Sequence, residues 1–545
     1  MARTTVLDRT SAGATMLAVS ALLVLAACDG FTEGQLPTTA TGGYGGQGAA
    51  GGQGGAAGQL RFLQAVDGGM LVNPDAYERI VVRLEAPAGT GAVVLTAGEQ
   101  VVQATPDGDG RWAAEVQVSS LPAGTASLAA SAMVDGATVS SAAAELVVST
   151  TGAQLSDFFA DGFAGAPRLH RREGALWVTF TDRHEPAAEA WLRRLDGAGR
   201  WVGERIRLVG ADEETLYART ALGDESIGVL YQSPGEPYST HFKVVGFDGS
   251  ERLAPMDLDP PGRHGSFGGD IDFDGEAFVS VWRVNDEADR GQVRWLRVDE
   301  MSLEATGPVV VASSGAGTVD EPEGSFPPFS FVAVQPVGAR SLVAFVRGRY
   351  EGVLGEVVPK SQIAAVDNDG TVAWTRYAGI ENDLTWHREA RLFPYAERVL
   401  ALWSATDLTA PGDMPPNWFY ATLSDADGEL DPLRGKGELV VDGVDDRDEP
   451  AFVEHPSLPG VLAWVDHRAY TLDPANGQLD VYAAPLDDAL YAAEPAVFKH
   501  AKPFAGLTQL GAAVAGTNVV LVWRDQRHSQ GLDGIMELWF DTVWL

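Results

Sequence analysis

Val519-Val520-Leu521-Val522-Trp523 is one of seven short runs that recur through residues 151–545 and decide the fold. Each run is aliphatic or β-branched and closes on an aromatic residue, a composition that is typical of buried strands. Successive closing residues are 51 to 63 positions apart in the chain. Recurrence at such a period indicates a tandem array of one supersecondary unit. The closing residues are Phe180, Tyr231, Trp282, Phe345, Trp403, Trp464 and Trp523.

Asp-containing turns follow most of these runs, as at Leu195-Asp196-Gly197 and Phe247-Asp248-Gly249. Such turns tolerate positive φ angles and suit the twist of antiparallel hairpins. Each unit is therefore predicted to contain three or four antiparallel strands, and no stretch has the period of a useful amphipathic helix. Seven such units in tandem resemble a β-propeller, whose blades pack face to face around an axis. A six-bladed ring is the alternative, in which the fourth unit, closing on Phe345, is degenerate.

The last unit ends at Trp544-Leu545, one strand short of the others. We expect residues Leu155–Phe163, which precede the first unit, to supply the missing outer strand. That pairing would close the ring and remove the open sheet edges of a linear array.

Residues 59–150 form a separate predicted unit, in which short apolar stretches alternate with turn signals such as Asp135-Gly136. About seven short strands in this length predict a β-sandwich. The order of strands and turns resembles bacterial immunoglobulin-like modules, which often serve as spacers. The fold class is therefore expected to be all-β, with a small immunoglobulin-like β-sandwich followed over residues 151–545 by a seven-bladed, or alternatively six-bladed, β-propeller.

The N-terminus is predicted to be a targeting segment. Residues 1–27 have a basic start and an uncharged apolar run from Gly13 to Ala27, which is short for a membrane span. Leu25-Ala26-Ala27-Cys28 resembles the lipobox of bacterial lipoproteins, which implies cleavage before Cys28, acylation of its thiol and amine, and anchoring of the chain in a membrane. Residues 28–58 are rich in Gly and are predicted to be a flexible tether.

Composition excludes several classes of partner. The formal net charge is −36, which disfavours nucleic acid and anionic lipid surfaces. Cys28 is the single cysteine, so no intramolecular disulfide can form. The lipobox resemblance, with the predicted tether, spacer and propeller, implies a monomer in the bacterial cell envelope, at the outer membrane or cell surface rather than the inner membrane, with an envelope protein or glycan as its partner.

A second repeated pattern offers candidate ligand-binding residues. Two units carry Trp-x-Asp-x-Arg and a third carries a related Phe-x-Asp, which resembles a motif of bacterial propeller repeats. These polar residues either form a ligand site on one face or hold the blades together. Repetition favours the second interpretation, because a catalytic residue is needed once and a structural residue in every blade. The candidates are Asp182, Asp466, Arg468, Asp525 and Arg527.

Calcium is the one metal for which the sequence offers donors. Asp425, Asp427 and Asp431 lie in one oxygen-rich loop, and Asp270-x-Asp272-x-Asp274 is a second, although neither has the twelve-residue calcium loop. Solvated turns are the alternative interpretation of both. The nine histidines show no zinc-binding spacing, and no other cofactor motif is identified.

These patterns predict a non-enzymatic binding or scaffold protein, and they supply no catalytic set. The alternative is an envelope hydrolase that acts on glycans or peptides at the axial face of the propeller, since propellers host both functions. The Ser-x-Asp-x-Gly-x-Thr-Trp boxes of sialidase propellers do not occur. Sialidase chemistry needs three arginines on one carboxylate, with a Tyr and an acid/base carboxylate, and sequence alone does not show whether such residues converge. Convergence at the axis would favour the enzyme.

Overall fold

The structure is a computed structural model that describes residues 59–545 apart from position 109, residues 156–166 and a series of interstrand segments. Nearly all described residues are in strands or turns, and a single 3-10 turn, η1 (Val118–Ser120), interrupts them. No helix in this described part is long and apolar enough to cross a membrane. The predicted signal segment, Cys28 and the predicted tether lie outside the described residues. The longest undescribed interstrand segments are 379–384, 408–416, 433–446, 467–479, 499–509 and 526–536.

Two sheets with a common core form the N-terminal unit. Alternate residues of β3 and β8 are buried, the pattern of strands with one face on a core. Leu84 from the first sheet and Leu128 from the second belong to one apolar cluster, which defines a β-sandwich. The first sheet has the order β1 (Arg61–Phe62), β3 (Arg79–Glu85), β7 (Arg111–Gln117), β6 (Thr105–Pro106). The second has the order β2 (Gly69–Val72), β10 (Ala144–Val148), β8 (Gly124–Val134), β4 (Thr90–Ala97), β5 (Gln100–Gln103), with β9 (Ala137–Ser140) also on β8.

Seven four-stranded antiparallel sheets follow among the described residues, numbered here in chain order. Sheet 1 has the order β12 (Arg168–Arg172), β13 (Ala175–His184), β14 (Ala187–Leu195), β15 (Trp201–Val209). Sheet 2 has the order β16 (Tyr217–Leu222), β17 (Ser226–Ser233), β18 (Ser239–Gly246), β19 (Glu251–Asp257). Sheet 3 has the order β20 (Arg263–Phe273), β21 (Ala277–Asp286), β22 (Gly291–Asp299), β23 (Ala305–Ser313). Sheets 4 to 6 are β24 (Val332–Val337), β25 (Arg340–Glu351), β26 (Glu356–Asp367), β27 (Val372–Tyr377); β28 (Thr385–Tyr395), β29 (Arg398–Asp407), β30 (Asn417–Ser424), β31 (Leu430–Pro432); and β32 (Arg447–His455), β33 (Leu458–Asp466), β34 (Asp480–Leu486), β35 (Ala496–Phe498).

Sheet 7 combines both ends of the propeller. Its order is β11 (Ala153–Gln154), β38 (Glu537–Val543), β37 (Asn518–Asp525), β36 (Gly511–Ala515), so the outer strand comes from the N-terminal side. The backbone N–H of Leu155 extends the pairing by donating to Leu538 O at 2.8 Å. The expected closing strand at Leu155–Phe163 was therefore placed too late, because the pairing starts at Ala153, and residues 156–163 of it lie outside the described residues.

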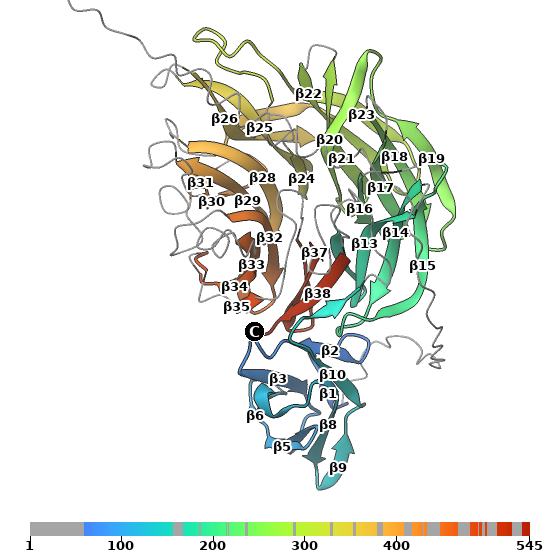
Figure 1. Ribbon diagram of the computed structural model, residues 1–545, viewed down its shortest axis with the longest axis vertical. Coiled ribbons are helices and arrows are strands. Elements are labelled where there is room, and N and C mark those ends of the chain that lie inside the picture. The colour runs from blue at the N-terminus through green and yellow to red at the C-terminus, as the bar shows by residue number, and fades with distance from the viewer. Residues whose placement is uncertain are drawn as a thin grey trace, which may run out of the picture.

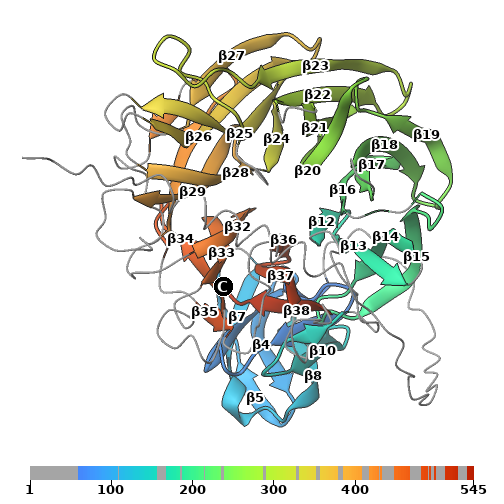
Figure 2. The ribbon, with the colours of Figure 1, turned by 45° about the horizontal axis from the view of Figure 1, so that its top comes forward.

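The sheets form a closed ring, the arrangement of an all-β propeller. The first strand of each sheet contacts the first strand of the next, and β36 of sheet 7 contacts both β32 and β12. Figure 2 shows these strands nearest the centre and the later strands outside. We therefore call the first strands the inner strands. The second strands are buried along both faces, as in β37, where all eight residues are buried. This double burial explains why the motif runs are continuously apolar rather than alternating.

The sandwich packs directly against the propeller below sheets 7 and 1 (Figure 1). Trp544, the residue before the C-terminal Leu545, follows sheet 7 and joins the sandwich core, where its Nε1 donates to Leu71 O at 2.8 Å. Asn73 Nδ2 donates to Asp541 Oδ2 at 3.0 Å. The backbones also approach closely, since a Cβ atom at Gly516 would lie 1.8 Å from Leu63 O. The end of the chain thus completes two cores at once.

Candidate functional site

The predicted Trp-x-Asp residues are buried inside the blades. Asp466 is fully buried, and its Oδ2 accepts a hydrogen bond from Trp464 Nε1 at 3.2 Å. Asp525 is also fully buried, and its Oδ2 accepts from Trp523 Nε1 at 2.9 Å. Each carboxylate therefore satisfies the indole N–H of its own strand. The side chains of Asp182, Arg468 and Arg527 lie outside the described residues.

The predicted calcium loop is a hydrogen-bonded turn. Asp425 Oδ1 accepts from the backbone N–H of Asp427 at 3.0 Å, and Asp427 Oδ1 accepts from Arg340 Nη1 of the neighbouring sheet at 2.9 Å. Asp431 pairs with Leu423 through the strand backbone, and its side chain is outside the described residues. Among the described residues no group of three or more His, Cys, Asp or Glu could hold a metal ion.

In the second predicted calcium loop, Asp270-x-Asp272-x-Asp274, the carboxylates of Asp270 and Asp274 form ion pairs with arginines. Asp270 Oδ1 lies 2.9 Å from Arg168 Nη1, and Asp270 Oδ2 accepts from the backbone N–H of Val334 at 3.1 Å. Asp274 Oδ2 lies 2.8 Å from Arg297 Nε. The Arg168–Asp270 pair is informative, because it joins the inner strands of sheets 1 and 3 past sheet 2.

Arg168 and Asp270 belong to a ring of equivalent positions around the axis, which we call the axial ring. Each member lies on an inner strand, opposite the residue that precedes the closing aromatic. Equivalent register places the members at one level of the propeller. Four of them are charged and three are small. The members in sheet order are Arg168, Arg219, Asp270, Ala333, Arg391, Ala451 and Gly511.

The three arginines of the axial ring act on one another electrostatically. Burial lowers the pKa of Arg219, and the positive charges of Arg391 and Arg168 lower it further. Asp270 acts on Arg219 in the opposite direction. Arg219 is 5% exposed, whereas the side chain of Arg168 is 24% exposed. The axial ring therefore holds three arginines, of which Arg168 pairs with the partly accessible Asp270 and Arg219 is within range of its charge.

Polar groups of the same inner strands surround the arginines. Tyr217 accepts a hydrogen bond at Oη from Arg219 Nε at 2.5 Å and donates to Gly269 O at 2.9 Å. His170 Nε2 lies 2.9 Å from Thr220 Oγ1. Burial lowers the pKa of His170 well below its ordinary value, and the charges of Arg168 and Arg219 add to the effect, so its imidazole is neutral at pH 7.

One carboxyl beside the axial ring holds its proton unusually tightly. Asp272 lies two residues beyond Asp270 on β20, and its Oδ2 accepts from Gln335 Nε2 at 2.8 Å. Burial raises the pKa of Asp272 to about 6 against the favourable charge of Arg168. A carboxyl with a pKa near 6 is partly protonated close to neutral pH and can donate a proton there.

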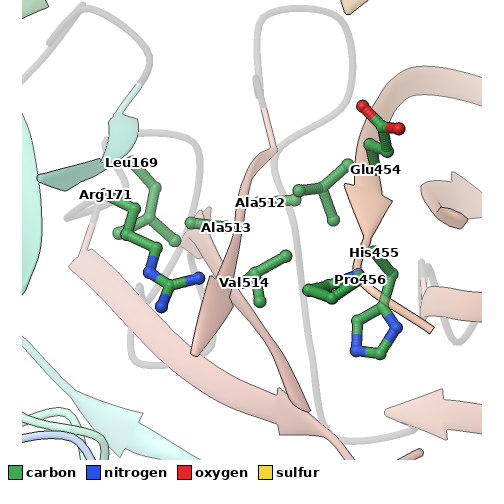
Figure 3. A pocket seen from close by; sticks show the side chains of 9 residues that line it. Leu169, Arg171, Glu454, His455, Pro456, Ala512, Ala513 and Val514 are labelled. Carbon is green, nitrogen blue, oxygen red and sulfur yellow. The ribbon is translucent and has the colours of Figure 1, made fainter. Parts of the chain in front are cut away.

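Space is present beside the axial ring where sheets 6, 7 and 1 meet. A cavity of about 500 Å³ opens between β32, β36 and β12, and Figure 3 shows Leu169 and Arg171 on one side of it and Pro456 on the other. Its base on β36 consists of the small side chains of residues 512–514. The cavity thus has small side chains on β36, next in the sequence to the ring residue Gly511.

Sequence reasoning did not identify the axial ring. Its seven residues come from seven different sheets and form no local motif. A signal was nevertheless present in the spacing. The ring residue lies 12 positions before the closing aromatic in six of the seven units, and 13 positions before it in the remaining one, which closes on Trp464. Aligning the units on their closing aromatics would have brought three arginines and one aspartate into a single column.

No protein family model matches the chain, and no curated protein matches it. Among solved structures, the propeller domain of the Trilobed protease from Pyrococcus furiosus is 11% identical over 70% of this chain and 98% of its own, with a TM-score of 0.37. A Hadza microbial sialidase is 10% identical over 89% of this chain and 99% of its own, with a TM-score of 0.37. An endo-β-1,4-mannanase from Thermotoga petrophila is 15% identical over 17% of this chain and 19% of its own, with a TM-score of 0.15. These similarities define no function, and the propeller fold rests on the strand order of the chain itself.

Proposed function

We propose that the propeller binds an anionic group of an envelope glycan at the axial ring. The observation that carries this proposal is the convergence of Arg168, Arg219 and Arg391 at one register position around the axis. Guanidinium groups recognise carboxylates through paired, charge-assisted hydrogen bonds. Asp270 is a single carboxylate among three arginines, which leaves the ring with an excess of positive charge.

The charge of the whole chain makes this excess more significant. The formal net charge is −36, so a buried cluster of cations is not a by-product of a basic composition. An arriving anion would also offset the mutual repulsion that lowers the pKa of Arg219. Interactions of this kind are stronger in a partly buried site than at the surface, because water screens them less.

Anchoring in the envelope is part of the same proposal. Acylation of Cys28 would hold the chain in a membrane, because two or three acyl chains bind stably where a single chain does not. Residues 28–58 would then give the folded part an r.m.s. reach of about 30 Å. Expressing the Cys28→Ala variant in a bacterial host tests this: the variant should move from the membrane to the soluble fraction, and continued membrane association would refute acylation as the anchor.

Binding can be tested by calorimetry with a galacturonate trisaccharide and its carboxyl-reduced, neutral counterpart. We expect the acidic form to bind and the neutral form to bind at least about tenfold more weakly. The Arg391→Ala variant should weaken binding of the acidic form by a similar factor. Arg376→Ala is the matched control, since Arg376 is exposed on the outer strand β27. Equal affinity of the wild type and Arg391→Ala for the acidic sugar would contradict the proposal.

Hydrolysis of the bound glycan is the second candidate function, and two residues favour it. Tyr217 directs its hydroxyl toward Arg219, and Asp272 has a pKa of about 6, which suits a general acid. The appearance of new reducing ends from an acidic oligosaccharide would establish turnover. Hydrolysis by Asp272 as acid should decline as pH rises above about 6, and the Asp272→Asn variant should lose that decline together with activity. Binding without turnover would leave the binding protein as the function.

A further inference from the structure

A second hollow, which we call the flank groove, lies away from the axis between sheets 1 and 2. Its volume is about 600 Å³. Trp177 of β13 and Arg194 of β14 are register partners, so they share the face of sheet 1 that lines it. The turn Phe247–Gly249 between β18 and β19 forms the opposite wall. The rings of Trp177 and Phe247 are 6.1 Å apart at their centroids.

Arginines lie beside these aromatic walls, and the carboxylates of Glu204 and Asp248 also line the groove. The guanidinium of Arg172 lies 4.0 Å from the centroid of the Phe247 ring. Arg205 and Arg207 line the groove from the exposed outer strand β15, and the Arg207 side chain is 62% exposed. Arg205 stacks over Trp191 at 3.9 Å. Cations that pack on aromatic rings are held in place and lose little freedom when a ligand arrives.

The flank groove lies in a basic part of a strongly acidic chain. Residues 168–209, which make up sheet 1, contain nine arginines and six acidic residues, against a net charge of −36 for the whole chain. Arg194 is paired with Asp67 of the sandwich, its Nε lying 3.0 Å from Asp67 Oδ2. The exposed Arg207 of β15 has a looser ion pair, since its Nη1 lies 3.8 Å from Glu189 Oε1.

We propose that the flank groove binds a segment of an acidic polysaccharide. Aromatic faces such as that of Trp177 match the apolar faces of sugar rings, and guanidiniums match carboxylates along the polymer. A volume of about 600 Å³ is in the range of small-molecule sites and holds a few sugar units. This inference does not rest on the axial ring, because the two sites have no residue in common.

The test uses the full chain and measures its retardation in gels that contain polygalacturonate, with dextran gels as the neutral reference. Exchanging two exposed charges, in the Arg205→Glu/Arg207→Glu variant, should weaken affinity for polygalacturonate on the order of tenfold or more. Arg111→Glu is the matched control, since Arg111 is exposed on the sandwich strand β7. The Trp177→Leu variant keeps apolar bulk, removes the ring face, and should also weaken binding. Equal melting temperatures would show that the variants fold.

Several outcomes would overturn the inference. It fails if the Arg205→Glu/Arg207→Glu variant binds polygalacturonate as the wild type does, or if inorganic polyphosphate competes as well as polygalacturonate. The axial site is tested separately in the same gels with Arg391→Ala. Loss of retardation in Arg391→Ala alone refutes the flank groove and supports the axial ring, and loss in the Arg205→Glu/Arg207→Glu variant alone does the reverse.

Discussion

Replacing Trp544 by Ala tests how the end of the chain couples the sandwich to the propeller. Trp544 is 7% exposed, packs in the sandwich core and donates to Leu71 O. Truncation of a buried Trp to Ala costs about 3–5 kcal/mol, and the Leu71 carbonyl loses its indole donor as well. We therefore expect the free energy of unfolding to fall by about 4 kcal/mol, the middle of that range.

Calorimetry distinguishes the two ways in which this loss can appear. If residues 59–545 melt together, about 4 kcal/mol lowers Tm by about 4 °C, because the unfolding entropy scales with length. If the sandwich of about 90 residues melts alone, the same loss lowers its Tm by about 20 °C. The shared core predicts one transition in the wild type and an earlier, separate sandwich transition in Trp544→Ala.

The control for this experiment is Met301→Ala, because Met301 is 64% exposed and its loss should change stability by no more than about 0.5 kcal/mol. A Trp544→Ala protein that melts within about 1 °C of the wild type, in one transition, would refute the reasoning. That result would mean that the sandwich core does not depend on Trp544.

Other predictions concern the ring and its carboxylates. Deleting residues 535–545 removes β38, which pairs with both β11 and β37, and should abolish cooperative melting; unchanged melting would contradict a closed ring. Asp466→Ala should destabilise the protein by about 1–3 kcal/mol in urea, because it leaves Trp464 Nε1 without this acceptor; loss of ligand binding at full stability would instead make Asp466 a binding residue. Burial raises the pKa of Asp272 from 3.8 to about 6, so the folded state holds this proton more tightly than the unfolded chain. The stability that Asp272 contributes is therefore full below pH 3.8 and is lost as pH rises through about 6. Over that interval the wild type should lose stability relative to Asp272→Asn. Parallel profiles of stability against pH for the two proteins would refute this.

Much of the propeller could be predicted from sequence because its second strands are buried on both faces. A run such as Val461–Trp464 has no polar position to spare, so burial appears directly as composition. The closing strand was harder to place. Ala153–Gln154 is only two residues long and is half exposed, so it has no pattern of its own, and its position follows from pairing with β38 at the far end of the chain.

The candidate site could not be predicted in the same way, because its residues converge through the circular arrangement of the sheets. Arg168 and Asp270 are 102 positions apart and meet past an intervening sheet. The Trp-x-Asp pattern was easier to see because both of its residues lie on one strand. Asp466 and Asp525 each accept a hydrogen bond from the indole N–H of their own strand, whereas the expected bonds that hold the blades together stay a prediction.

The most direct test of the account is a crystal structure of the protein soaked with the galacturonate trisaccharide. We predict that its carboxylate lies within hydrogen-bonding distance of the Arg391 or Arg219 guanidinium at the axis. An empty axis at saturating ligand, with Asp270 unchanged in its contact with Arg168, would contradict the assignment of the axial ring as the binding site.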